Sequence, residues 1–204
     1  MKDVAQLPRT VAWSPVTSDV KPPMRTLLAA RCSLEPQVVA HAAEMFAVLS
    51  DPAIYEFENS PPASEAWLSE RFAKLESRTS KDGTERWLNW VIRLPSGDLA
   101  GFTQATIKTS GVAYIAYEIA SRFWRQGVGS CAVNAMLGEL ATGYGVHTFL
   151  AVLKARNYRS EGLLRHLGFS QTTSAQAAMA AAETDELVMH RSCGGGAKAA
   201  LGGQ

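Results

Sequence analysis

Residues 123–130, with the sequence FWRQGVGS, place two glycines, a basic side chain and a hydroxyl at the start of a predicted helix. Gly127 and Gly129 let the backbone approach a ligand closely. The N–H groups in the first turn of a helix have no partner inside the helix, and the helix dipole adds positive potential there. These features favour a bound pyrophosphate, with Arg125 and the Ser130 hydroxyl as further contacts.

Two other nucleotide motifs fit this segment poorly. Residues 127–132 match G-x-G-x-x-A, but a dinucleotide fold needs a strand that ends at the first glycine and an acidic residue about 20 positions further along. Six residues separate Ala120 from Gly127, and residues 152–154 hold no acid. No Gly-Lys-Ser or Gly-Lys-Thr sequence occurs, which excludes a Walker loop. A glycine-rich turn without a ligand is the plain alternative.

Glu118 is the odd residue of an apolar predicted strand. Tyr117 and Ile119 point to one face of that strand, and Glu118 points to the other. A carboxylate inside a central strand is unfavourable unless it is paired. Glu118 is therefore either a general base or amine-binding anion, or a structural carboxylate that is hydrogen-bonded to a neighbouring strand.

A second acidic group lies in the predicted loop of residues 55–62. Glu56 and Glu58 alternate there with the aromatic residues Tyr55 and Phe57. Two carboxylates beside aromatic rings suit a cationic amine. A solvated acidic loop is the alternative.

The elements that position these residues follow from the spacing of apolar side chains. In chain order the pattern predicts strand 24–32, helices 36–49 and 65–77, strands 87–94, 99–106 and 112–119, helix 127–141, strand 148–153, helix 157–167, and strands 169–173 and 186–190. Short connections between the middle strands favour antiparallel pairing. The order predicts an α+β fold with a mixed, mostly antiparallel central sheet flanked by helices.

Composition and charge exclude several classes of protein. The 204 residues carry 20 Lys and Arg against 19 Asp and Glu, so no bulk field attracts nucleic acid or a membrane surface. No apolar run has the length of a membrane span, and no signal pattern opens the chain. Cys32, Cys131 and Cys193 lack disulfide or metal-ligand spacing. We therefore expect no metal and a reducing, cytoplasmic location.

The sequence divides into three segments. Residues 1–24 carry four prolines without a period, which predicts an irregular N-terminal arm. Residues 25–192 form the predicted folded domain. Residues 193–204 are rich in glycine and alanine, which predicts a flexible tail.

The glycine segment resembles the pyrophosphate loop Q/R-x-x-G-x-G/A of the GNAT superfamily of N-acetyltransferases. Trp124 stands at its first position, as is familiar in the branch that includes the RimJ/RimL-type ribosomal-protein N-terminal acetyltransferases. Two further segments are similar to the same branch: N-x-x-S at residues 157–160 and L-G-F at residues 167–169. The three motifs occur in the expected order, and the resemblance covers about residues 25–192.

The resemblance implies a GNAT fold with acetyl-CoA as cosubstrate and a cleft between the fourth and fifth strands for the pantetheine arm. It implies that the following residues bind the cofactor: Tyr117, Ile119, Trp124, Arg125, Gln126, Gly127, Val128, Gly129, Ser130 and Asn157. Asn157 also suits the N-cap of its helix, and both roles stay open. The resemblance places Tyr55, Glu56 and Glu58 over the acceptor site.

Acetyl transfer from a thioester needs a neutral amine and a proton for the leaving thiolate. Glu118 is the candidate base. Ser160 resembles the serine that is placed to protonate the thiolate in the RimL-like branch, and a solvated helix hydroxyl is the alternative. Many other GNAT enzymes use a tyrosine as the acid, and the matching position here is Leu164. That departure shifts the role to Ser160 or to water.

We therefore expect an acetyl-CoA-dependent N-acetyltransferase in which a primary amine of a protein N-terminus, a peptide or a small molecule attacks directly. We expect no nucleic-acid or membrane partner. A dimer is common among similar proteins, which keeps a homodimer open. The alternative is a non-catalytic CoA-binding module with the same fold, and an unrelated α+β binding domain is the third reading. An open cleft that reaches Glu118 and the Glu56 loop favours the enzyme.

Overall fold

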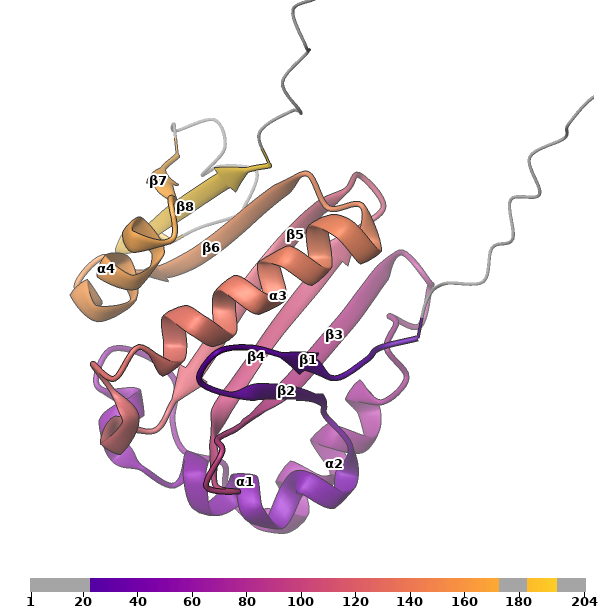
Figure 1. The fold of residues 1–204 in the computed structure, drawn as a ribbon, viewed down its shortest axis with the longest axis vertical. Helices are drawn as coiled ribbons and strands as arrows, with labels where there is room; N and C mark the ends of the chain where they lie inside the picture. The colour runs from indigo at the N-terminus through magenta and orange to yellow at the C-terminus, as the bar shows by residue number, and fades with distance from the viewer. Residues whose placement is uncertain (1–22, 173–182, 194–204) are drawn as a thin grey trace, which may run out of the picture.

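The computed structural model describes residues 23–172 and 183–193 (Figure 1). Most of the predicted arm at 1–24 and of the predicted tail at 193–204 therefore lies outside the described residues. Within the described part, no helix is long and apolar enough to cross a membrane. No group of three side chains that could hold a metal ion occurs in that part either.

The described residues form one eight-stranded sheet in the order β1-β2-β3-β4-β5-β6-β8-β7. Neighbouring strands are antiparallel, except for the parallel pair β5 and β6. The strands are β1 (Leu27–Leu28), β2 (Ser33–Pro36), β3 (Glu85–Arg93), β4 (Leu99–Lys108), β5 (Val112–Ile119), β6 (Thr148–Lys154), β7 (Ser170–Gln171) and β8 (Glu186–Ser192). This sheet and its flanking helices confirm the predicted α+β fold.

Helices cover both faces of the sheet (Figure 1). On one face lie α1 (Ala42–Leu49) and α2 (Glu65–Leu75), which pack against Val91 of β3. On the other face lies α3 (Val128–Tyr144), and α4 (Tyr158–His166) joins the same core through the buried Leu164. Three short 3-10 segments complete the described helices: Val39–His41, Pro52–Tyr55 and Ser121–Phe123.

Strands β5 and β6 pair only where they begin. Their register runs from Val112 opposite Thr148 to Tyr114 opposite Leu150, and then the strands separate. Since β5 continues to Ile119, its last five residues have β4 on one side and an opening on the other. Because the sequence predicts only one strand before β3, β5 and β6 are the fourth and fifth predicted strands. This opening is therefore the predicted cleft.

Gly101 of β4 holds the end of β5 at unusually close range. Its φ is +151°, and a Cβ atom built on it would lie 1.9 Å from the carbonyl oxygen of Glu118. A side chain at this position would displace one of the two strands. The glycine therefore sets the position of the β5 backbone at Glu118.

The predicted strand over residues 24–32 is wrong. The chain folds back there, with the Ala29 N–H donating to the Cys32 carbonyl at 3.0 Å, and β1 and β2 form a hairpin. The two residues between Ala29 and Cys32 are Ala30 and Arg31, which carry none of the usual glycine or proline signals of a turn. The predicted helix at 36–49 also begins later, because Pro36 still belongs to β2 and the α-helix starts at Ala42.

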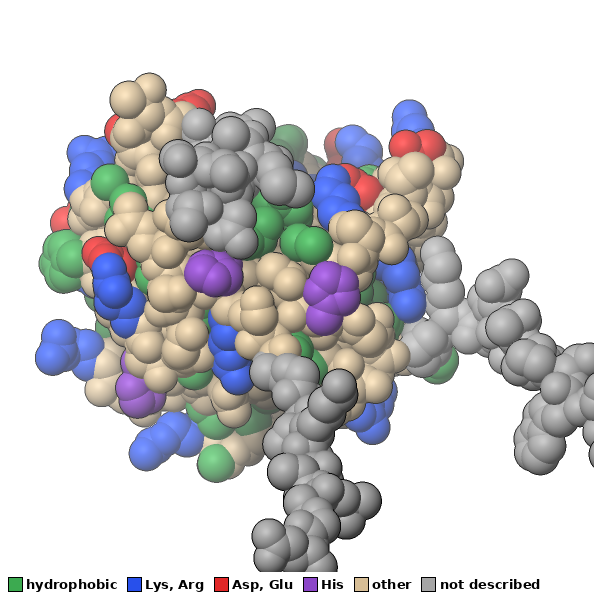
Figure 2. Space-filling model, turned by 90° about the horizontal axis from the view of Figure 1, so that it is seen from above, with side chains coloured by type: hydrophobic (Ala, Val, Ile, Leu, Met, Phe, Trp, Pro, Cys, Tyr) green, Lys and Arg blue, Asp and Glu red, His purple; other side chains and the backbone are tan. Residues whose placement is uncertain are grey.

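The face shown in Figure 2 carries charged side chains of both signs. Its Lys and Arg side chains are scattered and form no single basic patch on this face. This distribution agrees with the near-balance of charge in the sequence.

Candidate functional site

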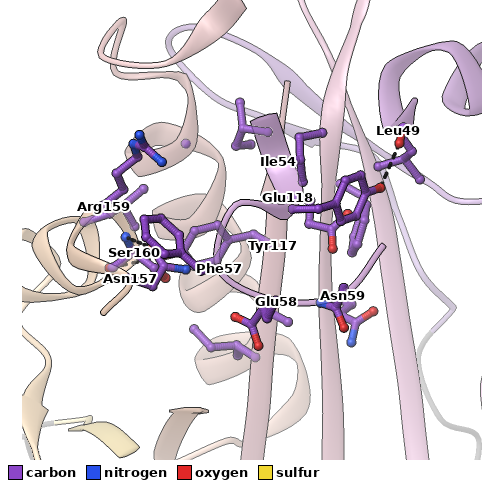
Figure 3. A pocket seen from close by; sticks show the side chains of 18 of the residues that line it. Leu49, Ile54, Phe57, Glu58, Asn59, Tyr117, Glu118, Asn157, Arg159 and Ser160 are labelled. Carbon is purple, nitrogen blue, oxygen red and sulfur yellow. Dashed lines mark hydrogen bonds between the residues drawn. The ribbon is translucent and has the colours of Figure 1, made fainter. Parts of the chain in front are cut away.

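A cavity of about 1170 Å³ opens where β5 and β6 diverge (Figure 3). Its walls come from residues 53–62, from α2, from the second half of β5 and from the first turns of α3 and α4. It continues over β4 and β3 beneath α2. The cavity therefore joins the predicted cofactor turn to the predicted acceptor loop.

The start of α3 presents backbone donors to this cavity. Gly127 is the N-cap, with a φ of 76° that glycine adopts without strain. Its carbonyl accepts a hydrogen bond from the Cys131 N–H at 3.0 Å, so the N–H groups between them have no partner within the helix. Gly129 allows close packing, since a Cβ atom on it would lie 3.0 Å from Leu163 of α4. An anion in this part of the cavity meets these donors and the positive end of the helix dipole.

Trp124 and two arginines shape the approach to α3. The Trp124 indole N–H donates to the Ile119 carbonyl at 2.7 Å, which ties the turn to the end of β5. Arg125 lines the cavity in a left-handed conformation, with a φ of 58°. Arg31, at the tip of the β1–β2 hairpin, lies beside the turn, because a Cβ atom on Gly127 would lie 3.3 Å from its Nε. Sequence reasoning missed Arg31, since no local pattern links the hairpin to α3.

Most of the predicted cofactor-binding residues share this cavity. Those in its wall are Tyr117, Ile119, Trp124, Arg125, Gly127, Gly129, Ser130 and Asn157. Gln126 and Val128 lie outside it: the Gln126 amide donates to the Arg122 carbonyl at 2.7 Å, and the Val128 side chain is buried in the core.

Tyr117 and Ser160 meet where β5 faces the first turn of α4 (Figure 3). Their hydroxyl oxygens are 2.8 Å apart, and the Tyr117 hydroxyl is 3.3 Å from the Ser160 carbonyl oxygen. Burial raises the pKa of Tyr117 to about 12, although the bond to Ser160 opposes this rise. The Asn157 side chain accepts from the Ser160 N–H at 3.0 Å and is the N-cap of α4, which confirms one of its two predicted roles.

Glu118 lines the cavity on the face of β5 that α2 covers. No hydrogen bond or ion pair to its carboxyl occurs among the described residues, so the alternative of a paired structural carboxylate has no support. Burial raises the pKa of Glu118 to about 7, the negative charge of Glu58 adds to the rise, and Arg71 opposes it. A carboxyl with this pKa changes its charge near neutral pH and is suited to general-base catalysis.

The predicted acceptor loop contributes unequally to the cavity. Tyr55 and Glu58 line it, and the Tyr55 hydroxyl donates to the Leu49 carbonyl at 2.8 Å. Burial, with a smaller effect of the Glu186 charge, raises the pKa of Glu58. Glu56 does not line the cavity, and its carboxylate forms an ion pair at 2.5 Å with Arg159, which does. A role of Glu56 in acceptor binding stays a prediction.

Comparison with known proteins identifies the family of this chain. Residues 31–170 match the acetyltransferase (GNAT) domain. This chain belongs to the GNAT acetyltransferase family. By sequence alone, it matches no curated protein.

Solved structures agree with this GNAT fold. RimL, a ribosomal L7/L12 α-N-protein acetyltransferase solved with coenzyme A, has 15% identity and a TM-score of 0.70, over 82% of this chain and 98% of that one. The ribosomal-protein-S5-alanine acetyltransferase of Vibrio fischeri has 15% identity and a TM-score of 0.67, over 83% and 97%. The microcin C7 self-immunity acetyltransferase MccE, solved with acetyl-CoA and AMP, has 16% identity and a TM-score of 0.67, over 80% and 93%.

Arg159 is a further site residue of this GNAT domain that sequence reasoning missed. Its guanidinium lies 4.6 Å from the ring centre of Trp124 and 5.3 Å from that of Phe57, in addition to its ion pair with Glu56. Arg156 donates to the Phe57 carbonyl at 2.9 Å. Arg159 of α4 therefore contacts both the predicted acceptor loop and the predicted cofactor turn, and Figure 3 shows it on the same side of the cavity as Phe57. The two segments are far apart in the sequence, so only the fold reveals this contact.

Proposed function

We propose that this GNAT protein is an acetyl-CoA-dependent N-acetyltransferase that acts on a primary amine of a protein N-terminus, a peptide or a small molecule. The observation that carries the proposal is the position of Glu118. Its carboxyl, which has no partner among the described residues, shares one cavity with the start of α3, whose first N–H groups have no partner within the helix. The RimL and MccE structures, which hold coenzyme A and acetyl-CoA, support the choice of cofactor.

The chain's own groups fit this cofactor. In the proposal the pyrophosphate is held by the backbone N–H groups of Val128, Gly129 and Ser130, with the Arg125 guanidinium as a counter-charge. Gln126 contributes through its backbone, since its side chain is engaged elsewhere. The open side of β5 supplies backbone groups for the amide-containing pantetheine arm.

The chemistry requires a base for the ammonium group and an acid for the thiolate. Glu118 takes a proton from the bound ammonium group, which is most effective for an α-amino group with a pKa near 8 and less so for a lysine side chain near 10.4. The neutral amine then attacks the acetyl carbonyl, so that a C–N bond forms and the C–S bond breaks. The thiolate takes a proton from the hydroxyl pair of Tyr117 and Ser160, and the second proton that the attacking nitrogen loses, passed through solvent, restores this pair.

Cofactor binding and thiol release test this function separately. Acetyl-CoA at 100 times its Kd should raise the free energy of unfolding by about 2.7 kcal/mol, and NADH and ATP should have much smaller effects. A library of primary amines should then contain acceptors that release free thiol from acetyl-CoA. The absence of a thermal shift with acetyl-CoA contradicts the cofactor assignment. Binding without thiol release from any amine would favour the non-catalytic CoA-binding module.

A further inference from the structure

The cavity extends past Glu118 to two buried amide side chains that the cofactor and the base do not use. Gln37 is 2% exposed and Asn89 is 3% exposed, and both residues line the cavity. The amide nitrogen of each, Nε2 of Gln37 and Nδ2 of Asn89, has no hydrogen-bond partner among the described residues. Buried amide donors without partners are uncommon in folded proteins, so this pair calls for an explanation.

Strand register places these amides on the same face of the sheet as Glu118. Asn89 of β3 lies opposite Gln104 of β4, which lies opposite Ala116 of β5, two residues before Glu118. Gln37 extends β2 beside them, because its N–H donates to the Asn89 carbonyl at 2.9 Å. Strand order therefore arranges the cofactor cleft, the candidate base and the two amides in sequence across the sheet.

The distance between Glu118 and Asn89 sets the length of an acceptor that reaches both residues. Asn89 and Glu118 are two strands and two residues apart. With strands about 4.8 Å apart and a rise of about 3.4 Å per residue, their Cα atoms are about 12 Å apart. This distance matches about three residues of an extended peptide.

The surroundings of the two amides favour a ligand group that only accepts hydrogen bonds, either a neutral carbonyl or a carboxylate. The wall above them is apolar, with Leu68, Phe72 and Leu75 from α2. A carbonyl or carboxylate oxygen accepts from amide N–H groups and offers no donor that would need a partner of its own. Arg71, which also lines the cavity, adds positive charge on the same helix.

We propose that Gln37 and Asn89 form a subsite for a carbonyl or carboxylate oxygen of the acceptor, remote from its reacting amine. The acceptor class is then an amine whose chain carries such an oxygen within about three peptide residues, and a plain alkylamine is a poor substrate. This inference rests on the proposed N-acetyltransferase function, of which it specifies the substrate.

Substitution of one amide tests the subsite. Asn89→Leu keeps the approximate volume and removes the donor. With trialanine amide as acceptor and thiol release as the readout, KM should rise ten-fold or more while kcat changes less than two-fold. For heptylamine, which has no oxygen, kcat/KM should stay within two-fold. Each acceptor is compared between wild type and Asn89→Leu, so the different pKa values of the two amines do not affect the result.

Three further measurements make the result decisive. Trialanine with a free carboxylate, compared with its amide, distinguishes a carboxylate from a carbonyl as the preferred group. Thr103→Val is the matched control, because its buried hydroxyl also has no partner among the described residues but does not line the cavity. It should leave every KM unchanged. Gln37→Met replaces Asn89→Leu if that variant does not fold.

The outcomes separate the subsite from the function. An equal change for trialanine amide and heptylamine, or no change for either, overturns the subsite while the acetyltransferase stands. If wild type releases no thiol with any amine, the function fails, and the subsite is judged by binding. Trialanine amide should then raise the Tm of the CoA-loaded wild type more than that of Asn89→Leu. Equal shifts in the two proteins overturn the subsite as well.

Discussion

The hydroxyl oxygen of Tyr117 lies 2.8 Å from that of Ser160, which links β5 to the first turn of α4 beside the cofactor cleft. Leu164, which stands where many GNAT enzymes carry an acid tyrosine, is fully buried one turn further along α4. The chain thus offers two hydroxyl groups at a different place. Because one can pass its proton to the thiolate and regain a proton from the other, the pair is a stronger candidate for the acid than either residue alone.

Removing one hydroxyl tests this pair. Tyr117→Phe and Ser160→Ala should each lower kcat by about ten-fold or more, because each removes a proton donor from the route to the thiolate. The double variant should be little worse than the single ones, since the residues act as one unit. Steady-state kinetics at saturating acetyl-CoA gives kcat for the two single variants and the double variant. A wild-type kcat in both single variants would leave water as the acid.

The role of Glu118 appears in the pH dependence of the rate. With a pKa of about 7, its carboxyl is protonated at pH 6 and ionised at pH 8, so kcat should rise with pH between these values. Glu118→Gln should lower kcat by about 100-fold and remove this limb. Its affinity for acetyl-CoA should be close to that of wild type. A raised acceptor KM with unchanged kcat would instead make Glu118 an amine-binding anion.

The same carboxyl makes the stability of the free protein depend on pH. Between pH 4.5, its ordinary pKa, and pH 7, folded Glu118 holds a proton that the unfolded chain has lost. The free energy of unfolding should therefore fall as the pH rises through this window, by about 3 kcal/mol in total. Urea denaturation at pH 4.5 and pH 8 should show that Glu118→Gln lacks this fall. Glu70→Gln, an exposed α2 variant outside the cavity, should retain the wild-type difference between the two pH values.

Substitution of Gly101 in β4 should lower the stability of the protein. Gly101→Ala places a Cβ atom against the Glu118 carbonyl, so we expect a loss of about 1–3 kcal/mol of stability and a lower kcat from a displaced carboxyl. Gly138→Ala in α3 is the control, because its Cβ would meet nothing within 4 Å. It should raise stability by about 0.5–1 kcal/mol. Thermal unfolding of both variants gives the comparison, and equal stabilities would contradict the close contact.

The sequence predicted those parts of the site that depend on neighbours in the chain. The glycine turn before α3 and the N-cap at Asn157 are local features, and their spacing was enough. Contacts between distant segments were missed, as with Arg31 beside Gly127 and Arg159 against Glu56. The hairpin turn at Ala29–Cys32 was missed for another reason: Ala30 and Arg31 are not residue types that are typical of turns.

The divergence of β5 and β6 has a consequence for hydrogen exchange. From Ile115 to Ile119, β5 lies at the centre of an eight-stranded sheet and yet has an edge. Amide hydrogens on that edge should exchange with solvent as quickly as those of an outer strand, although the surrounding core stays folded. In the proposed function a bound pantetheine arm would take the place of the missing strand segment, so acetyl-CoA should slow the exchange of these amide hydrogens. Deuterium uptake at these few residues then measures occupancy of the cleft, independently of global unfolding.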